Sequence, residues 1–140
     1  MIRKKPRTLV LFSGGLDSIL AVKILESMGC AVAALTFESP FFTAEKVKSV
    51  AEKLNIEIFV RDFSKEIFRL VRNPPCGFGK NLNPCLDCRA TMLRRAAAFA
   101  RKNNFQILAS GEVVGQRPFS QNRAALDRVA AFLEDLGVAA

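Results

Sequence analysis

A glycine-rich loop near the N-terminus is the segment best suited to bind an anion. The apolar run Leu9-Val10-Leu11-Phe12 leads directly into Ser13-Gly14-Gly15-Leu16-Asp17-Ser18 and then into an expected helix. Two glycines allow a tight turn that brings backbone amides close to a ligand, and a helix N-terminus adds positive potential. Asp17 can cap this helix or hold a magnesium ion between phosphates. An ordinary glycine-rich turn is the alternative interpretation, and the segment is neither a Walker A loop nor GxGxxG.

The cysteines are the second candidate chemical group. Cys85 and Cys88 lie three residues apart at an expected helix start, where the helix N-terminus and Arg89 favour the reactive thiolate. Three uses fit this pattern: a sulfur-transfer pair, an iron–sulfur cluster that also takes Cys76, or half of a zinc site. Simple burial is a fourth interpretation. Cys30 begins an apolar run and is expected in the core.

The composition excludes several common forms of catalysis. Among 140 residues there is no His, Trp or Tyr, whereas Phe occurs 12 times. Ser/His/Asp triads, Cys/His dyads and His-ligated metal sites are therefore excluded. Lys and Arg total 21 against 13 Asp and Glu, and the resulting charge of +8 favours polyanionic partners. No apolar run is long enough to cross a membrane, so we expect a cytoplasmic protein.

The elements that position these groups are predicted from apolar patterning. We expect strands at residues 8–12, 31–37, 56–60 and 106–109, and helices at residues 17–28, 44–54, 64–71, 86–102 and 126–136. Thr43 and Ser64 are the expected caps of two of these helices, and Phe63 and Phe68 are placed to form a hydrophobic staple. The alternation predicts an α/β domain with a parallel sheet of four to five strands between two helical layers.

Three loops follow the carboxyl ends of these strands, where such sheets bind ligands. They are residues 13–18, 37–42 and 110–121. The segment of residues 72–85 has no periodicity and is expected to be a long loop, and long loops in compact domains are usually functional or mobile. Beyond it, several basic side chains form a candidate phosphate-binding face, with a solvated helix surface as the alternative: Arg89, Arg94, Arg95 and Arg117.

The first loop resembles the SGGxDS motif of the PP-loop ATP pyrophosphatases, which cleave ATP between the α and β phosphates. Two further segments resemble the 4-thiouridine synthetases of tRNA: residues 36–46 after the second expected strand, and Gly111 to Gln116 after the fourth. The Asn83-Pro84-Cys85 segment with Cys88 is similar to the 2-thiouridylases of tRNA. The resemblance covers residues 7–136.

This resemblance implies a three-layer, Rossmann-like fold of the adenine nucleotide alpha hydrolase type and a division of labour within it. Pyrophosphate and Mg²⁺ would be held by the first loop, through Ser13, Gly14, Gly15, Asp17 and Ser18. The backbone at Thr36 and Phe37 would hold adenine, and Gly111 and Gln116 would lie near the α-phosphate. The implied activity is adenylation of a tRNA uridine, with Asp17 as a catalytic residue, followed by sulfur transfer through Cys85 and Cys88.

Two other functions stay open. One is adenylation of a small molecule, and the other is a non-catalytic nucleotide-binding or iron–sulfur module that assists a partner. The typical 4-thiouridine synthetase lacks the paired cysteines and has separate tRNA-binding domains, so residues 1–140 read as one PP-loop domain, either minimal or truncated at its C-terminus. A cysteine desulfurase or sulfur carrier is the expected sulfur donor, and exposed strand edges favour a homodimer.

Overall fold

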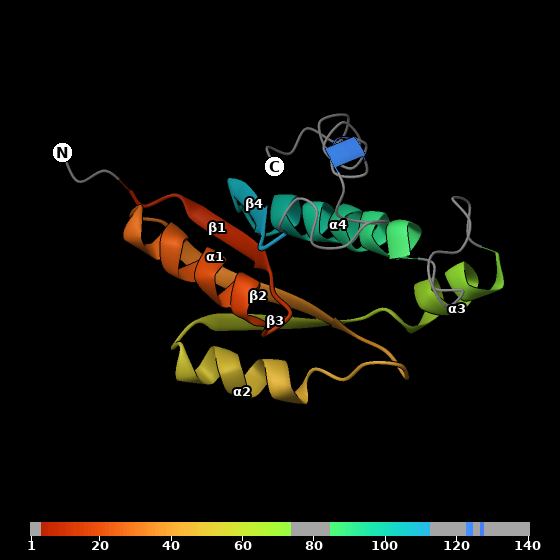
Figure 1. Cartoon of the computed structure of the whole chain (residues 1–140). Helices are drawn as coiled ribbons and strands as arrows, with labels where there is room; N and C mark the ends of the chain where they lie inside the picture. The colour runs from red at the N-terminus through yellow and green to blue at the C-terminus, as the bar shows by residue number, and fades with distance from the viewer. Residues whose placement is uncertain (1–3, 74–84, 113–122, 125–126, 128–140) are drawn as a thin grey trace.

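Four parallel strands form the centre of the molecule in a computed structural model that describes residues 4–73, 85–112, 123–124 and 127. The sheet has the order β3-β2-β1-β4. The strands are β1 (Arg7–Leu11), β2 (Ala31–Glu38), β3 (Glu57–Asp62) and β4 (Ile107–Ser110). Each lies within about two residues of its predicted range, and the parallel α/β fold is confirmed (Figure 1). The predicted helix at residues 126–136 falls almost entirely outside the described residues.

The helices cover both faces of this sheet. On one face lie α1 (Leu16–Ser27) and α2 (Glu45–Lys53), and on the other lie α3 (Ser64–Arg72) and α4 (Cys85–Lys102). Successive residues of β1 point to opposite faces, so Leu9 and Leu11 pack with α3 and α4, whereas Val10 and Phe12 pack with α1 and α2. Burial on both faces explains why the strands read as continuous apolar runs.

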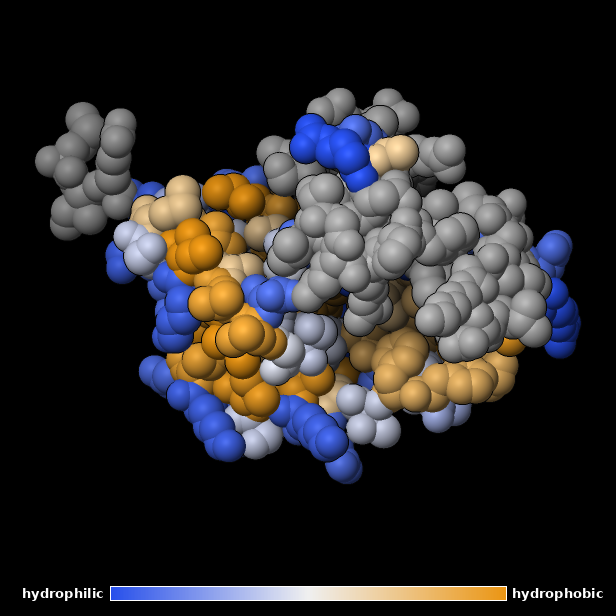
Figure 2. Space-filling model, viewed as in Figure 1, coloured by the Kyte–Doolittle hydropathy of each residue, from blue (hydrophilic) through white to orange (hydrophobic). Residues whose placement is uncertain are grey.

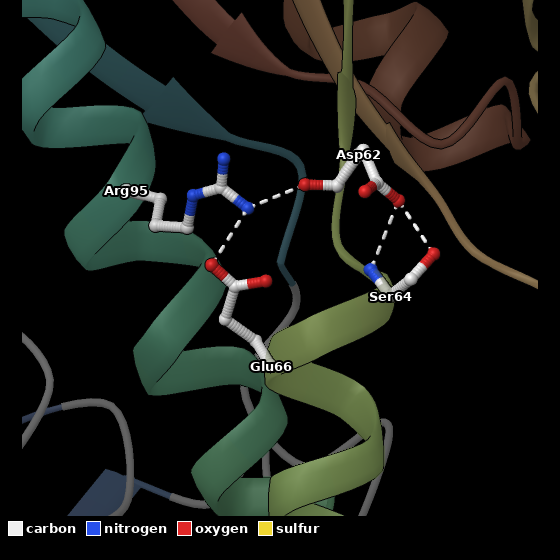
Figure 3. Close-up of polar contacts among 4 residues, drawn as sticks. All are labelled: Asp62, Ser64, Glu66 and Arg95. Atoms are coloured by element: carbon white, nitrogen blue, oxygen red, sulfur yellow. Dashed lines mark hydrogen bonds and ion pairs between the residues drawn. The ribbon is translucent and has the colours of Figure 1, made fainter.

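The start of α3 differs from the prediction. Ser64 is the first helical residue and does not cap the helix, because the Asp62 carboxylate accepts hydrogen bonds from its amide (3.0 Å) and its hydroxyl (2.5 Å) (Figure 3). Thr43 is also not a cap, since α2 begins after Ala44 without a side-chain cap bond. The staple is wrong too: Phe63 is fully buried against Phe37, at 5.3 Å between ring centroids, and does not meet Phe68.

Arg95 joins α4 to this end of α3. One of its Nη atoms donates to the backbone oxygen of Asp62 at 2.5 Å and pairs with Glu66 Oε1 at 3.0 Å (Figure 3). The guanidinium also lies 5.4 Å from the ring centroid of Phe37 and 6.0 Å from that of Phe63. These contacts fix the position of α3 relative to the carboxyl ends of β2 and β3.

This junction predicts a pH-dependent contribution to stability. Hydrogen bonds from the Ser64 hydroxyl and amide, with the charge of Arg95, lower the pKa of Asp62 below its ordinary value. A lowered pKa contributes stability above the unfolded value of about 3.9, and this contribution is lost as the pH falls through the folded value. We expect Asp62→Asn to reduce the free energy of unfolding in urea at about pH 7 more than at about pH 3. An equal reduction at both pH values would contradict this role.

No helix within the described part of the chain is long and apolar enough to span a bilayer.

Candidate functional site

Hydroxyl groups hold the glycine-rich loop between β1 and α1 in shape. The Ser13 hydroxyl donates to Ser18 Oγ at 3.3 Å, and the Ser18 hydroxyl donates to the carbonyl of Gly15 at 2.9 Å. Gly14 has a φ of +76°, a left-handed conformation that glycine adopts without strain. Hydrogen bonds within the loop therefore hold its shape.

The loop ends in the first turn of α1, which supplies the polar groups that an anion needs. Gly15 precedes the helix, and the amides of residues 16–18 have no acceptor within it. Asp17 lies in this turn and is partly exposed, whereas Ser18 is only 4% exposed. Amide donors beside one accessible carboxylate fit a phosphate with its magnesium ion.

Gly111 brings the end of β4 into direct contact with this turn. A Cβ atom built on Gly111 would lie 2.6 Å from the carbonyl carbon and oxygen of Asp17 and 2.7 Å from the amide nitrogen of Ser18. No side chain fits at such distances from backbone atoms. The glycine therefore allows Gly111 and Ser18, which are 93 residues apart in the sequence, to pack main chain against main chain.

An ion pair ties the start of α4 to the same place. Arg89 Nε pairs with Glu112 Oε1, and the Glu112 side chain is only 9% exposed. The Ser110 hydroxyl lies 3.5 Å from the second carboxylate oxygen of Glu112. Because Glu112 follows Gly111, the second turn of α4 is held near the end of β4 and hence near the loop of residues 13–18.

At its carboxyl end, β2 extends beyond its pairing with β1. The register between β1 and β2 ends at Leu11 and Leu35, and the Phe12 amide makes a last bond to the Leu35 carbonyl at 2.9 Å. Beyond this point Thr36 and Phe37 pair only with β3. Both residues are buried.

The cysteines are placed unequally. Cys88 is a half-buried thiol that packs against the α3–α4 side of the core, and Cys30 is a half-buried thiol just before β2. Cys85 is the first residue of α4, and Cys76 lies outside the described residues. Where the structure describes the chain, no group of three or more Cys, Asp or Glu is arranged to hold a metal ion.

The predicted basic face divides into three parts. Arg89 and Arg95 form the internal contacts with Glu112 and Glu66 described above. Arg94 is exposed and lines a pocket of about 370 Å³ between α3 and α4, together with Arg69, Leu70, Asn73, Asp87, Ala90 and Thr91. Arg117 and the predicted ligand residue Gln116 lie outside the described residues.

A larger hollow of about 570 Å³ lies at the amino ends of the strands. Its lining residues are Lys4, Lys5, Pro6, Arg7, Asn104 and Gln106. These residues stand at the amino ends of β1 and β4, so this hollow is remote from the loop of residues 13–18. Larger volume does not make it the better candidate, because ligands of parallel sheets bind at the carboxyl ends of the strands.

Sequence reasoning did not single out Glu112 as a functional residue. Its position beside Gly111 indicated a place near the site. Its partner Arg89 is 23 residues away in the sequence, so the ion pair could not be predicted from local residues. Phe41 and Phe68 were also missed as a pair, because only the tertiary structure shows that both rings are exposed.

Comparison with known proteins agrees with this geometry. A family model described as "Thiamine biosynthesis protein (ThiI)" matches residues 4–131. The tRNA-specific 2-thiouridylase MnmA of Campylobacter curvus (strain 525.92) is 31% identical over 118 residues, which are 77% of this chain and 35% of that protein. A probable tRNA sulfurtransferase of Thermoanaerobacter sp. (strain X514) is 29% identical over 116 residues, 76% of this chain and 29% of that protein.

The fold is also found in a crystal structure of a 4-thiouridine synthetase–RNA complex with bound ATP. The TM-score is 0.76 at 23% identity, and the match covers 90% of this chain and 34% of that one. The chain thus spans about a third of the length of these relatives. Because the family model covers nearly all of the sequence, the chain belongs to the ThiI family of PP-loop ATP pyrophosphatases.

Proposed function

We propose that this chain is the ATP-using domain of a tRNA-thiolating enzyme, which adenylates a uridine and then exchanges the activated oxygen for sulfur. One observation carries the proposal: Gly111 packs against the first turn of α1, and the neighbouring Glu112 pairs with Arg89 of α4. Cys88 directly precedes Arg89, so the end of β4 links the helix that carries the thiol to the turn proposed to bind phosphate. The matched relatives named as tRNA-modifying proteins support the same choice of substrate.

In this proposal the glycine-rich loop binds the phosphates of ATP. The amides of the first turn of α1 donate to the phosphate oxygens, and the Ser13 hydroxyl turns from Ser18 Oγ to a phosphate oxygen when ATP binds. The backbone of Thr36 and Phe37 contacts adenine. The accessible Asp17 carboxylate fits a Mg²⁺ ion, which when bound neutralises charge on the phosphates. Gly111 leaves room for the α-phosphate end of the nucleotide beside the loop.

The first step is attack of a uridine carbonyl oxygen on the α-phosphorus. The bond from that phosphorus to the bridging oxygen breaks, pyrophosphate leaves with the bonding electrons, and AMP stays attached to the base. This chain's residues orient the phosphates and stabilise the charge that develops on the leaving group, since backbone amides need no reorganisation during the reaction.

The second step transfers sulfur to the activated carbon. A persulfide on Cys88, loaded by a donor such as a cysteine desulfurase or sulfur carrier, attacks that carbon with its terminal sulfur and AMP leaves. The Cys85 thiolate then attacks Sγ of Cys88, which releases the thiolated base and leaves a Cys85–Cys88 disulfide. An external thiol reduces this disulfide. Residues three apart on a helix are neighbours on its surface, which suits this exchange.

The proposal is tested by incubating the chain with ATP, Mg²⁺ and bulk tRNA and separating the nucleotide products. We expect AMP and pyrophosphate in equal amounts and stimulation by tRNA. ADP as the product would exclude this chemistry, and AMP formation without tRNA stimulation would indicate adenylation of a small molecule instead.

Cys88→Ser is expected to leave AMP formation near the wild-type rate and to abolish thiolation. The thiol acts only after the base is activated, and serine keeps the size of the side chain. Thionucleoside in digested tRNA and AMP are measured from the same reaction, with Cys30→Ser as the matched control that should keep both. Equal loss of both products in Cys88→Ser would contradict the separation of the two steps.

The alternative that the cysteines bind a [4Fe–4S] cluster or Zn²⁺ is tested on the same protein. A cluster would use Cys76, Cys85 and Cys88, with one iron open to sulfide. Anaerobic purification with absorption spectra and iron and zinc analysis distinguishes these cases, because a metal-free, colourless protein that still thiolates tRNA requires the persulfide.

A further inference from the structure

An aromatic pair stands exposed beside the candidate site. Phe41 lies in the turn after β2 and Phe68 on α3, and their ring centroids are 5.6 Å apart in an edge-to-face arrangement. The two residues remain 62% and 54% exposed, whereas Phe12 and Phe63 are almost completely buried. Val71, also on α3, is 44% exposed. In Figure 2 apolar surface is visible on the side of the molecule where α3 lies.

Two arginines extend this surface along α3. Arg69 and Arg72 are exposed and follow Phe68 within about one turn of the helix. The nearby acidic groups are occupied elsewhere: Glu66 of α3 is paired with Arg95 at 3.0 Å, and Asp62, at the end of β3, accepts the two hydrogen bonds of Ser64 (Figure 3). The outer face of α3 is therefore cationic and aromatic.

This face adjoins the pocket between α3 and α4. It also lies at the carboxyl ends of the strands, where the glycine-rich loop lies. Arg69 lines the 370 Å³ pocket between α3 and α4, which Arg94 also lines. Phe41 follows the carboxyl end of β2, and α3 follows the carboxyl end of β3 (Figure 1). A ligand on α3 would thus approach the candidate site from the β3 side.

We propose that this α3 surface, formed by Phe41, Phe68, Arg69 and Arg72, binds unpaired nucleotides of the RNA substrate. The rings stack on bases, which is a sequence-tolerant contact, and the guanidiniums pair with phosphates. The proposal rests on the proposed function, because RNA is the polyanion that this function brings to the chain. The complementary charge and the accessible rings together favour single-stranded RNA over a duplex, whose bases are not free to stack.

This α3 surface differs from the predicted basic face, whose members are Arg89, Arg94, Arg95 and Arg117. On α4, Arg89 and Arg95 are held in ion pairs with Glu112 and Glu66. On α3 the cations are exposed instead, because the helix turns its one glutamate toward Arg95.

The test is binding of the 140-residue chain to a fluorescently labelled, uridine-containing single-stranded RNA, with a duplex of the same length for comparison. We expect Phe68→Ala to weaken single-strand binding by roughly 5- to 50-fold, with a smaller effect on the duplex. Arg69→Gln with Arg72→Gln should weaken binding and reduce the slope of log affinity against log salt by about 1.4. Phe68→Leu keeps an apolar side chain and should behave like Phe68→Ala, since leucine cannot stack.

Matched controls lie on the other face of the sheet. Lys48→Gln with Lys53→Gln removes two exposed charges from α2, and Ile24→Ala removes an exposed apolar side chain from α1. Wild-type RNA affinity in Phe68→Ala and Phe68→Leu, an equal loss in the controls, or no RNA binding by the wild type would each overturn the proposal. So would a dimer in sedimentation experiments that dissociates on Phe68→Ala, because the rings would then serve a protein contact. The RNA-binding assay contains no ATP and is therefore independent of the AMP assay. If RNA binding depends on α3 but the AMP assay shows no AMP, the adenylation proposal alone is overturned.

Discussion

Gly111→Ala is expected to reduce AMP formation by about 100-fold, because displacement of reacting groups by about 1 Å changes the rate by a factor of that size, and to weaken ATP binding. The added methyl group would lie 2.6 Å from backbone atoms of Asp17. The backbone cannot yield as a flexible side chain does, so the first turn of α1 must shift away from the end of β4. We also expect the free energy of unfolding to fall by about 1–3 kcal/mol, as for other overpacked sites.

Gly15→Ala is the matched control for this substitution. Its Cβ would lie 3.5 Å from Ser13 Oγ, an ordinary contact, and its φ of −80° is suitable for alanine. The urea unfolding curve of Gly15→Ala should therefore coincide with that of the wild type, whatever its effect on ATP. Calorimetric titration with ATP and the AMP assay complete the comparison. Unchanged stability and ATP affinity in Gly111→Ala would show that β4 and α1 do not pack as closely as described.

Asp17→Ala is expected to reduce AMP formation by at least about 100-fold while the chain stays folded, because electrostatic groups of this kind contribute rate factors of that order. Asp17 is the acidic residue in the first turn of α1, next to the amides proposed to bind phosphate. Its loss removes the proposed carboxylate ligand of Mg²⁺. Stability should fall by only about 0.3–1 kcal/mol, the usual value of a favourable charge at a helix N-terminus.

Glu26→Ala, on the same helix, separates this role from a general loss of negative charge. Glu26 forms an exposed ion pair with Lys23 at 3.0 Å, and such pairs contribute about 0–1 kcal/mol. We expect its AMP formation to match the wild type. Initial rates over a range of Mg²⁺ concentrations provide the measurement, and a wild-type dependence on Mg²⁺ in Asp17→Ala would rule out the assigned ligand.

The elements that sequence predicted well are those with local signals. The glycine-rich loop, the strand before it and the helix after it are adjacent in the chain, so residue types alone indicate the turn between them. Helix caps were predicted less well. At α3 the competing carboxylate of Asp62 captures both polar groups of Ser64, and Phe68 reaches Phe41 instead of Phe63.

The sequence by itself determined the parallel α/β fold, the position of the glycine-rich loop and the family, because hydrophobic periodicity and one contiguous motif carry that information. Only the tertiary structure decided how the site is assembled. Gly111 meets Asp17, Arg89 pairs with Glu112, and Phe41 stands beside Phe68 with both rings in solvent. These contacts join segments that crossover helices bring together, and their geometry depends on the packing of whole layers. No local pattern of residues encodes that packing.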